Sequence, residues 1–221
     1  MKKKQEKSND LMNLIMVLVI IIILSFSLGI FIKRISSPKV VKEYSNGFTF
    51  TKLQNSKFWS TTIVNSKTRQ EIEFNNIRYF PSELNEVIVK GNPREFIQRI
   101  TESQANAAYL TYIPEGNTSN SALVYGNSSL VALTYADLAT FLKKINGINL
   151  VLACTRNETG FCETVATITC ENQHGSSMVI YLKPSNVTRL IMSDACLVIE
   201  GNGSNLLKAY TKLLFLWYGI L

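Results

Sequence analysis

The sequence predicts an α/β fold with α+β character: an N-terminal transmembrane helix, then one domain with a mixed β-sheet and a disulfide-bearing antiparallel C-terminal third. Three observations support this prediction. A long uncharged apolar run lies near the N-terminus, strand-like and helix-like segments alternate through the middle of the chain, and four cysteines lie close together near its end. About three helices are expected in the domain from the apolar periodicity.

The apolar run is residues 11–32, which contain no charged side chain. At 1.5 Å per residue this run is about 33 Å long, and a bilayer core is about 30 Å thick. A buried core helix would show a polar stripe, and Leu14 to Leu24 shows none. A cleaved secretory signal would also begin with lysines, but its apolar part is only about 7 to 15 residues long. The run is therefore predicted to be an uncleaved signal-anchor of a single-pass membrane protein.

The segments around this anchor follow from composition. We expect a basic N-terminal tail (1–10), the transmembrane helix (11–32), a juxtamembrane linker (33–46) and one exterior globular domain (47–221). Residues 1–34 hold six basic and two acidic side chains, which is +4 of the net charge of +7. The basicity thus belongs mostly to the membrane flanks, so the lipid bilayer is the expected partner and nucleic acid is not.

The side of the membrane on which the domain lies is predicted from the cysteines. Charge gives no answer, because basic residues lie on both flanks of the anchor. Cys154, Cys162, Cys170 and Cys196 form no CxxC pair, and disulfides between them would require an oxidising exterior. Four cysteines allow three pairings, of which 154 with 162 and 170 with 196 is preferred; reduced core thiols and a four-cysteine zinc site are the alternatives. Five Asn-x-Ser/Thr sequons are glycosylation candidates: Asn117, Asn127, Asn157, Asn186 and Asn202.

Within the domain, apolar residues recur with strand or helix period. Strands are expected near residues 48–50, 59–63, 72–74, 87–89, 109–113 and 150–154, a turn at 81–85, and helices from Asn92-Pro93 and over 128–145. Asn92 is expected to cap its helix. Strand-like runs at 165–170, 178–182, 188–192 and 195–199 are expected to pair antiparallel. An apolar helix over 206–217 is expected in the core, after a tight turn at Gly201 to Gly203 with Ser204 as N-cap.

Candidate chemistry is sparse, and no catalytic, metal-binding or cofactor-binding residue is predicted. The only histidine, His174, lies in a polar run typical of a surface turn. Asp137 is expected on the polar side of a helix and Asp194 in a turn. Glu71 and Glu73 would face the same side of a strand, which is more typical of a solvated face than of an acid-base pair.

Several segments resemble a group of archaeal single-pass membrane-anchored proteins with a C-terminal exterior α/β domain. They are the Lys-rich start with one span, the Phe48-Thr49-Phe50 strand, the loop 153–160, the strand 168–170 and the C-terminal segment 216–221. The resemblance covers most of the chain and implies its topology. It carries no activity and no site.

Together these features predict a membrane-anchored, non-enzymatic interaction or assembly component of the cell envelope, with a protein partner at the membrane. An exterior hydrolase whose site is assembled by the fold is the first alternative. A pilin-like structural subunit is the second, although the apolar run lacks an acidic residue near its start. A concave pocket with converging polar groups would favour the hydrolase, and an exposed apolar patch would favour the interaction component.

Overall fold

A computed structural model describes residues 16–25, 39–64, 68–102, 107–113, 128–157, 161–172 and 178–221. The chain divides into two units, one of residues 1–41 and 53–55 and one of residues 42–52 and 56–221. In the first unit, residues 16–25 form an α-helix with every side chain exposed. The helices in the described ranges include none that is long and apolar enough to cross a membrane.

The predicted span 11–32 is therefore seen only in its middle part. Residues 11–15 and 26–32 lie outside the described residues, as do the tail 1–10 and residues 33–38 of the predicted linker. The transmembrane helix stays a prediction.

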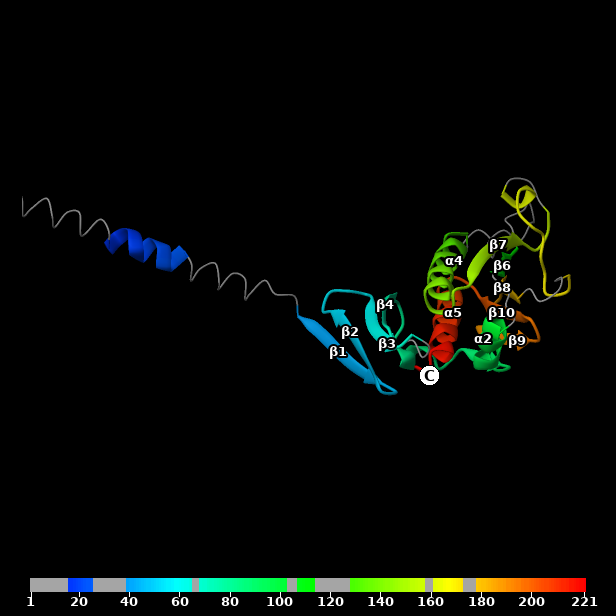
Figure 1. Cartoon of the computed structure of the whole chain (residues 1–221), viewed down its shortest axis with the longest axis horizontal. Coiled ribbons are helices and arrows are strands. Elements are labelled where there is room, and N and C mark those ends of the chain that lie inside the picture. Colours follow the sequence, from blue (N-terminus) through cyan, green and yellow to red (C-terminus); the bar gives the residue numbers. More distant parts are fainter. Residues whose placement is uncertain are drawn as a thin grey trace, which may run out of the picture. The chain divides into compact units, whose positions relative to one another are not determined.

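The first sheet has four strands in the order β1-β2-β3-β4 (Figure 1). Its strands are β1 (Val40–Ser45), β2 (Phe48–Leu53), β3 (Trp59–Val64) and β4 (Glu71–Ile77). The β2/β3 and β3/β4 pairs are antiparallel, as expected for the predicted hairpin. Along β2 to β4 the side chains alternate, so Phe50, Ile63 and Phe74 are buried while their neighbours face outward.

Strand β1 differs from the prediction, because Val40–Ser45 lies within the segment expected to be a linker. The turn that follows explains the strand. Asn46 and Gly47 have φ values of 48° and 82°, and positive φ at both central residues is typical of the two-residue turn that closes a hairpin. The Asn-Gly pair and the β-branched Val40 and Val41 carry this signal, which the polar, basic composition of the segment obscured.

The second sheet has six strands in the order β5-β9-β10-β8-β6-β7. They are β5 (Ile88–Lys90), β6 (Ala107–Tyr112), β7 (Asn149–Cys154), β8 (Met178–Pro184), β9 (Arg189–Ser193) and β10 (Cys196–Gly201). Strands β10, β8, β6 and β7 are mutually parallel neighbours, β5 is parallel to β9, and β9 is antiparallel to β10. The prediction of a mixed sheet is confirmed.

The prediction of an antiparallel C-terminal third is confirmed for β9 and β10, which pair antiparallel, but it is wrong for β8, which lies between β6 and β10 and is parallel to both. Its core residues Met178 to Ile180 are all buried, which is typical of a central parallel strand. The strand expected at 165–170 is also absent, and only Thr167 forms a bridge, to Cys154. Thr169 and Asn172 instead exchange side-chain to backbone hydrogen bonds, which compete with strand pairing.

Three helices accompany the sheets: α2 (Pro93–Glu102), α4 (Ser128–Phe141), which continues into the π-helical turn η2 (Leu142–Asn146), and α5 (Ser204–Trp217). Short 3-10 turns are η1 (Pro81–Leu84) and η3 (Phe161–Glu163). The predicted cap of α2 is confirmed, since Asn92 Oδ1 accepts hydrogen bonds from the N–H groups of Arg94 and Glu95 at 3.1 and 3.3 Å. The N-cap of α5 is Gly203 (φ 56°) rather than the expected Ser204, because the turn requires a positive φ there.

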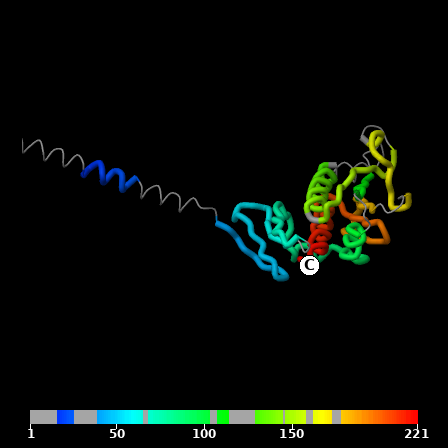
Figure 2. Tube along the Cα trace, viewed as in Figure 1, coloured from blue at the N-terminus to red at the C-terminus, as the bar shows by residue number. Residues whose placement is uncertain are grey.

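Helix α5 lies at the centre of the core, as predicted for the last apolar segment. It contacts β9, β10, α2, α4 and η1. In Figure 2 it is the red segment of the tube, which leads to the C-terminus. Phe215 is buried and meets Phe50 of β2 edge-to-face, with ring centroids 5.8 Å apart. The small sheet and the helical layer therefore share one apolar interior.

Both preferred disulfides are confirmed. Cys154 is bonded to Cys162 and Cys170 to Cys196, which leaves no free cysteine in the chain. The first bond closes the loop after β7. The second ties the segment that follows this loop to the start of β10.

We expect Phe215→Ala to lower the free energy of unfolding by about 3 to 5 kcal/mol, because it opens a cavity beneath β2 that the backbone cannot close. The half-buried neighbour Leu216 on the same helix is the matched control, and Leu216→Ala should cost clearly less. Urea titration of the full chain in detergent, followed by the fluorescence of the buried Trp59 and Trp217, measures both. Equal losses for the two variants would contradict a core centred on Phe215.

Candidate functional site

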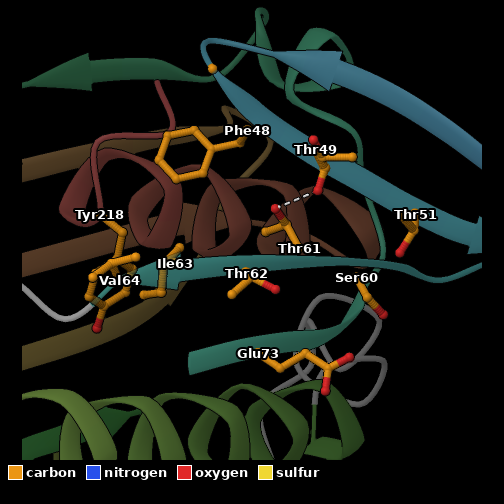
Figure 3. Close-up of a pocket in the computed structure, with 11 residues that line it drawn as sticks. Phe48, Thr49, Thr51, Ser60, Thr61, Thr62, Ile63, Val64, Glu73 and Tyr218 are labelled. Carbon is orange, nitrogen blue, oxygen red and sulfur yellow. Dashed lines mark hydrogen bonds between the residues drawn. The ribbon is translucent and has the colours of Figure 1, made fainter. Parts of the chain in front are cut away.

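A hollow with a volume of about 650 Å³ lies on the small sheet between β2 and β3 (Figure 3). This is within the range of small-ligand and peptide sites, about 300 to 1,000 Å³. Its lining consists of hydroxyl, apolar and aromatic side chains and one carboxylate: Gly47, Phe48, Thr49, Thr51, Ser60, Thr61, Thr62, Ile63, Val64, Glu73 and Tyr218.

The hollow exists because β2 and β3 separate. Their register contains only two pairs, Phe50 with Thr61 and Thr51 with Ser60. Beyond the first pair the strands diverge, so that Phe48 and Val64 lie on opposite sides of the gap in Figure 3. At the point of divergence the hydroxyl of Thr61 donates a hydrogen bond to the carbonyl oxygen of Thr49 at 2.9 Å.

The direction of the backbone groups at this gap follows from strand geometry. Within a strand, the N–H and C=O of one residue point to the same side, and successive residues alternate between the two sides. The carbonyl of Thr49 points toward β3, because it accepts the bond from Thr61. Extending the register makes Thr62 the residue opposite Thr49, so the backbone groups of Thr62 and Val64 point toward β2, where the pairing has ended.

The gap is thus edged by main-chain donors and acceptors of two strands. On the other side of β3, residues 61–64 remain paired with β4, which holds the edge in an extended conformation. Such an edge can accept a further extended chain through main-chain hydrogen bonds.

Polar and aromatic side chains surround these backbone groups. Glu73 of β4 is exposed and is the one carboxylate of the lining. Tyr218, just after α5, stacks edge-to-face on Phe74 with centroids 5.2 Å apart. Within the described part of the chain its buried phenol oxygen has no hydrogen-bond partner, and burial raises the pKa of Tyr218, which therefore stays protonated as a potential donor.

A second polar group, smaller and more enclosed, lies where β4, α4 and α5 meet. Strand β4 contains a bulge between the pairs Thr61 with Phe74 and Trp59 with Ile77, and Asn76 within it has a positive φ of 62°. The bulge is followed by Arg78, whose charge acts on Asp137 of α4, and Tyr210 of α5 donates a hydrogen bond to the same carboxylate.

Burial dominates the electrostatics of this second group. It raises the pKa of Asp137, although the Arg78 charge and the Tyr210 hydrogen bond act in the opposite direction. Burial, together with the charge of Asp137, also raises the pKa of Tyr210 well above its usual value. The adjoining cavity is only about 20 Å³, room for about one water molecule, so we interpret the group as a structural contact between β4 and the helices.

The residues singled out in the sequence fall in different places. Asp137 was expected on the polar side of its helix, but it is half-buried in the contact just described. The sequence around Asp137 did not indicate this, because the residues of β4 and α5 that enclose it are distant in sequence. Asp194 is exposed in the β9–β10 turn. Glu73 lines the hollow while Glu71 does not. His174 lies outside the described residues.

Among the sequons, Asn157 and Asn186 are exposed and Asn202 is half-buried, while Asn117 and Asn127 lie outside the described residues. No group of three or more His, Cys, Asp or Glu side chains in the described ranges could hold a metal ion. The four cysteines form disulfides, so the alternative of a four-cysteine zinc site is wrong.

The hollow itself was missed at the level of sequence. Its signal is weak: alternating hydroxyl residues in Phe48 to Thr51 and Ser60 to Thr62 indicate two solvated strand faces, but nothing in that pattern indicates that the strands separate.

Comparison with known protein families, curated proteins and solved structures finds no match to this chain. The resemblance to archaeal membrane-anchored proteins therefore stays a prediction.

We expect Asp137→Asn to flatten the dependence of stability on pH. Because its pKa is raised, Asp137 keeps its proton in the folded protein at pH values where the unfolded chain has lost it. The contribution of Asp137 to the free energy of unfolding therefore falls as the pH rises above 3.8. The variant has no such proton to lose. Urea unfolding between about pH 4 and 7 measures the difference.

Asp194→Asn is the matched control, since it removes an exposed aspartate from a turn. Its pH profile should follow that of the wild type. An Asp137→Asn profile parallel to the wild type would show that the carboxyl is not shielded in the folded protein.

Proposed function

We propose that this chain is a membrane-anchored interaction or assembly component of the cell envelope, which binds an extended polypeptide segment of a partner in the hollow between β2 and β3. One observation carries the proposal: the backbone groups of Thr62 and Val64 point into a gap where the β2/β3 pairing has ended. Strand addition at such an edge gains affinity from main-chain hydrogen bonds and specificity from alternate side-chain positions.

The lining fits a peptide better than it fits a hydrolytic site. Ser60 and Glu73 are the nucleophile and base that the lining offers, and in Figure 3 they project from the neighbouring strands β3 and β4. No hydrogen bond joins their side chains in the described part of the molecule. The accessible hydroxyls of both strands, by contrast, can bond the carbonyls of an added chain; they belong to Thr49, Thr51, Ser60 and Thr62.

The location proposed for this binding is the cell exterior. Two disulfides in one domain support an oxidising compartment, and the exposed Asn157 and Asn186 sequons are compatible with it. An anchor at residues 11–32 would keep the hollow within reach of other membrane or envelope proteins, so even a weak strand-addition contact would form at high effective concentration.

Photo-cross-linking in intact cells tests the proposal. A benzophenone side chain at Thr51, in the lining, should yield an adduct whose partner peptide is one contiguous segment. Thr62→Trp, which fills the gap, should remove most of this adduct. Glu71→Trp introduces the same bulk at an exposed position of β4 outside the lining and should leave the adduct unchanged.

The same benzophenone at Lys144, exposed in η2, reports non-specific neighbours. An equal yield at Thr51 and Lys144, or an adduct that survives Thr62→Trp, would contradict binding in the hollow. Amide hydrogen exchange adds a main-chain readout, since strand addition should slow exchange at Thr62 and Val64.

A further inference from the structure

Among the described residues, the six-stranded sheet has one face covered by helices and another that is only partly covered. Side chains alternate along β10, so Leu197 and Ile199 point to the face that α5 contacts and are fully buried. Cys196, Val198 and Glu200 point to the opposite face. Because Cys196 is bonded to Cys170, the segment 166–172, which starts at the free edge of β7, reaches that opposite face at Cys170.

This segment covers only one side of the face. It begins beside β7, where the N–H of Cys154 donates to the carbonyl of Ala166 at 3.0 Å and the N–H of Ile168 donates to the carbonyl of Cys154 at 2.9 Å. Thr111, Ala153 and Val179, on the same face of β6, β7 and β8, are fully buried. Toward β9 and β5 the face becomes accessible.

The accessible part consists of two adjacent rows of residues, which we call the outer patch. Its apolar members are Tyr181, Val198 and Ile191, in register on β8, β10 and β9 and half-buried, together with Ile88 of β5, which is 49% exposed. Its charged members are Lys183 and Arg189, which pair with the buried carboxylate of Glu200, and Lys90 of β5, which is in register with Ile191.

Glu200 neutralises only part of this positive charge. Its carboxylate is 2% exposed and pairs with Lys183 at 3.2 Å and with Arg189. Burial would raise the pKa of Glu200, but hydrogen bonds from Arg189 and Lys183 outweigh burial and lower it, so the group is ionised at neutral pH. Glu171, exposed on the covering segment, adds a second negative charge, which acts on Tyr181. Three cations against two carboxylates leave the patch positive, with Lys90 exposed beside Ile191.

We propose that the outer patch is a docking surface for an acidic amphipathic helix of a partner protein. Strands β8 and β10 under the patch belong to the parallel part of the sheet, which normally carries a layer on both faces, and a helix is the usual cover. The apolar rows would take the apolar side of such a helix, and Lys90, Lys183 and Arg189 would meet carboxylates at its rim. A second copy of this chain fits poorly, since it would bring a positive patch against a positive patch.

A designed peptide tests this chemistry directly, independently of the β2–β3 hollow. The probe is a helix of about four turns with leucines on one side and glutamates at the rim, labelled for fluorescence anisotropy. The protein is the full chain in phosphatidylcholine nanodiscs. We expect saturable binding, which weakens as ionic strength rises.

Two variants with little effect on folding probe the two parts of the patch. Lys90→Glu should weaken binding roughly three- to tenfold, because it places like charges at the rim. Ile88→Ser should weaken it roughly threefold through lost apolar contact. Their matched controls are Lys144→Glu, an exposed lysine in η2, and Val40→Ser, a similarly exposed residue of β1, neither of which should change the affinity.

Four results would overturn the proposal: no saturable binding by the wild type, equal binding of a peptide with lysines in place of the glutamates, equal binding of an oligo-glutamate peptide without leucines, or insensitivity to Lys90→Glu. Binding of the chain without peptide to phosphatidylglycerol vesicles, lost in Lys90→Glu, would assign the patch to an anionic membrane surface instead and would also overturn it.

Discussion

The burial of α5 is the constraint on which the rest of the described fold depends. This helix is apolar around most of its circumference, with nine buried residues between Leu206 and Trp217, and such a helix has to be enclosed on several sides. The six-stranded sheet provides one side through β10, α2 and α4 provide others, and β2 completes the enclosure where Phe50 meets Phe215. Gly201 makes the close entry possible, because a Cβ there would lie 2.6 Å from the N–H nitrogen of Leu206.

The separation of β2 and β3 is understandable from the same packing. Phe50 is held toward α5 by Phe215 and Phe80, while Phe74 of β4 is held toward α4 by stacking on Phe141 with centroids 4.0 Å apart. Strands that follow two different packing partners twist away from each other, and the bulge in β4 increases this twist. The Thr61 hydroxyl, which bonds the carbonyl of Thr49 at 2.9 Å, satisfies part of the backbone that the divergence leaves unpaired.

Features that depend on local chemistry could be predicted from the sequence, and features that depend on distant partners could not. Asn92 caps α2 through its own neighbours, α5 shows its apolar period within one segment, and Cys154 lies only eight residues from Cys162. Strand β8 looks the same in sequence whether its neighbours are parallel or antiparallel, so its pairing was predicted wrongly. The contact of Arg78, Asp137 and Tyr210 joins three elements, and no local pattern marks it. Strand β1 is the exception, since its Asn-Gly signal was local and was overridden by composition.

The two disulfides link the local and the distant levels, because they determine which part of the large sheet stays accessible. Bonds between Cys154 and Cys162 and between Cys170 and Cys196 hold the segment 161–172 against β7 and the start of β10. The two bonds fix this segment at both ends, and on the same face Val179 and Thr111 are buried while Val198 and Ile191 are half-buried. An apolar side chain at position 200 would be cheaper to bury than Glu200, because it would avoid the desolvation of an ion pair. Retaining Glu200 between Lys183 and Arg189 instead keeps two cations fixed in orientation at the edge of an apolar surface, which is the arrangement expected of a surface that recognises a charged partner.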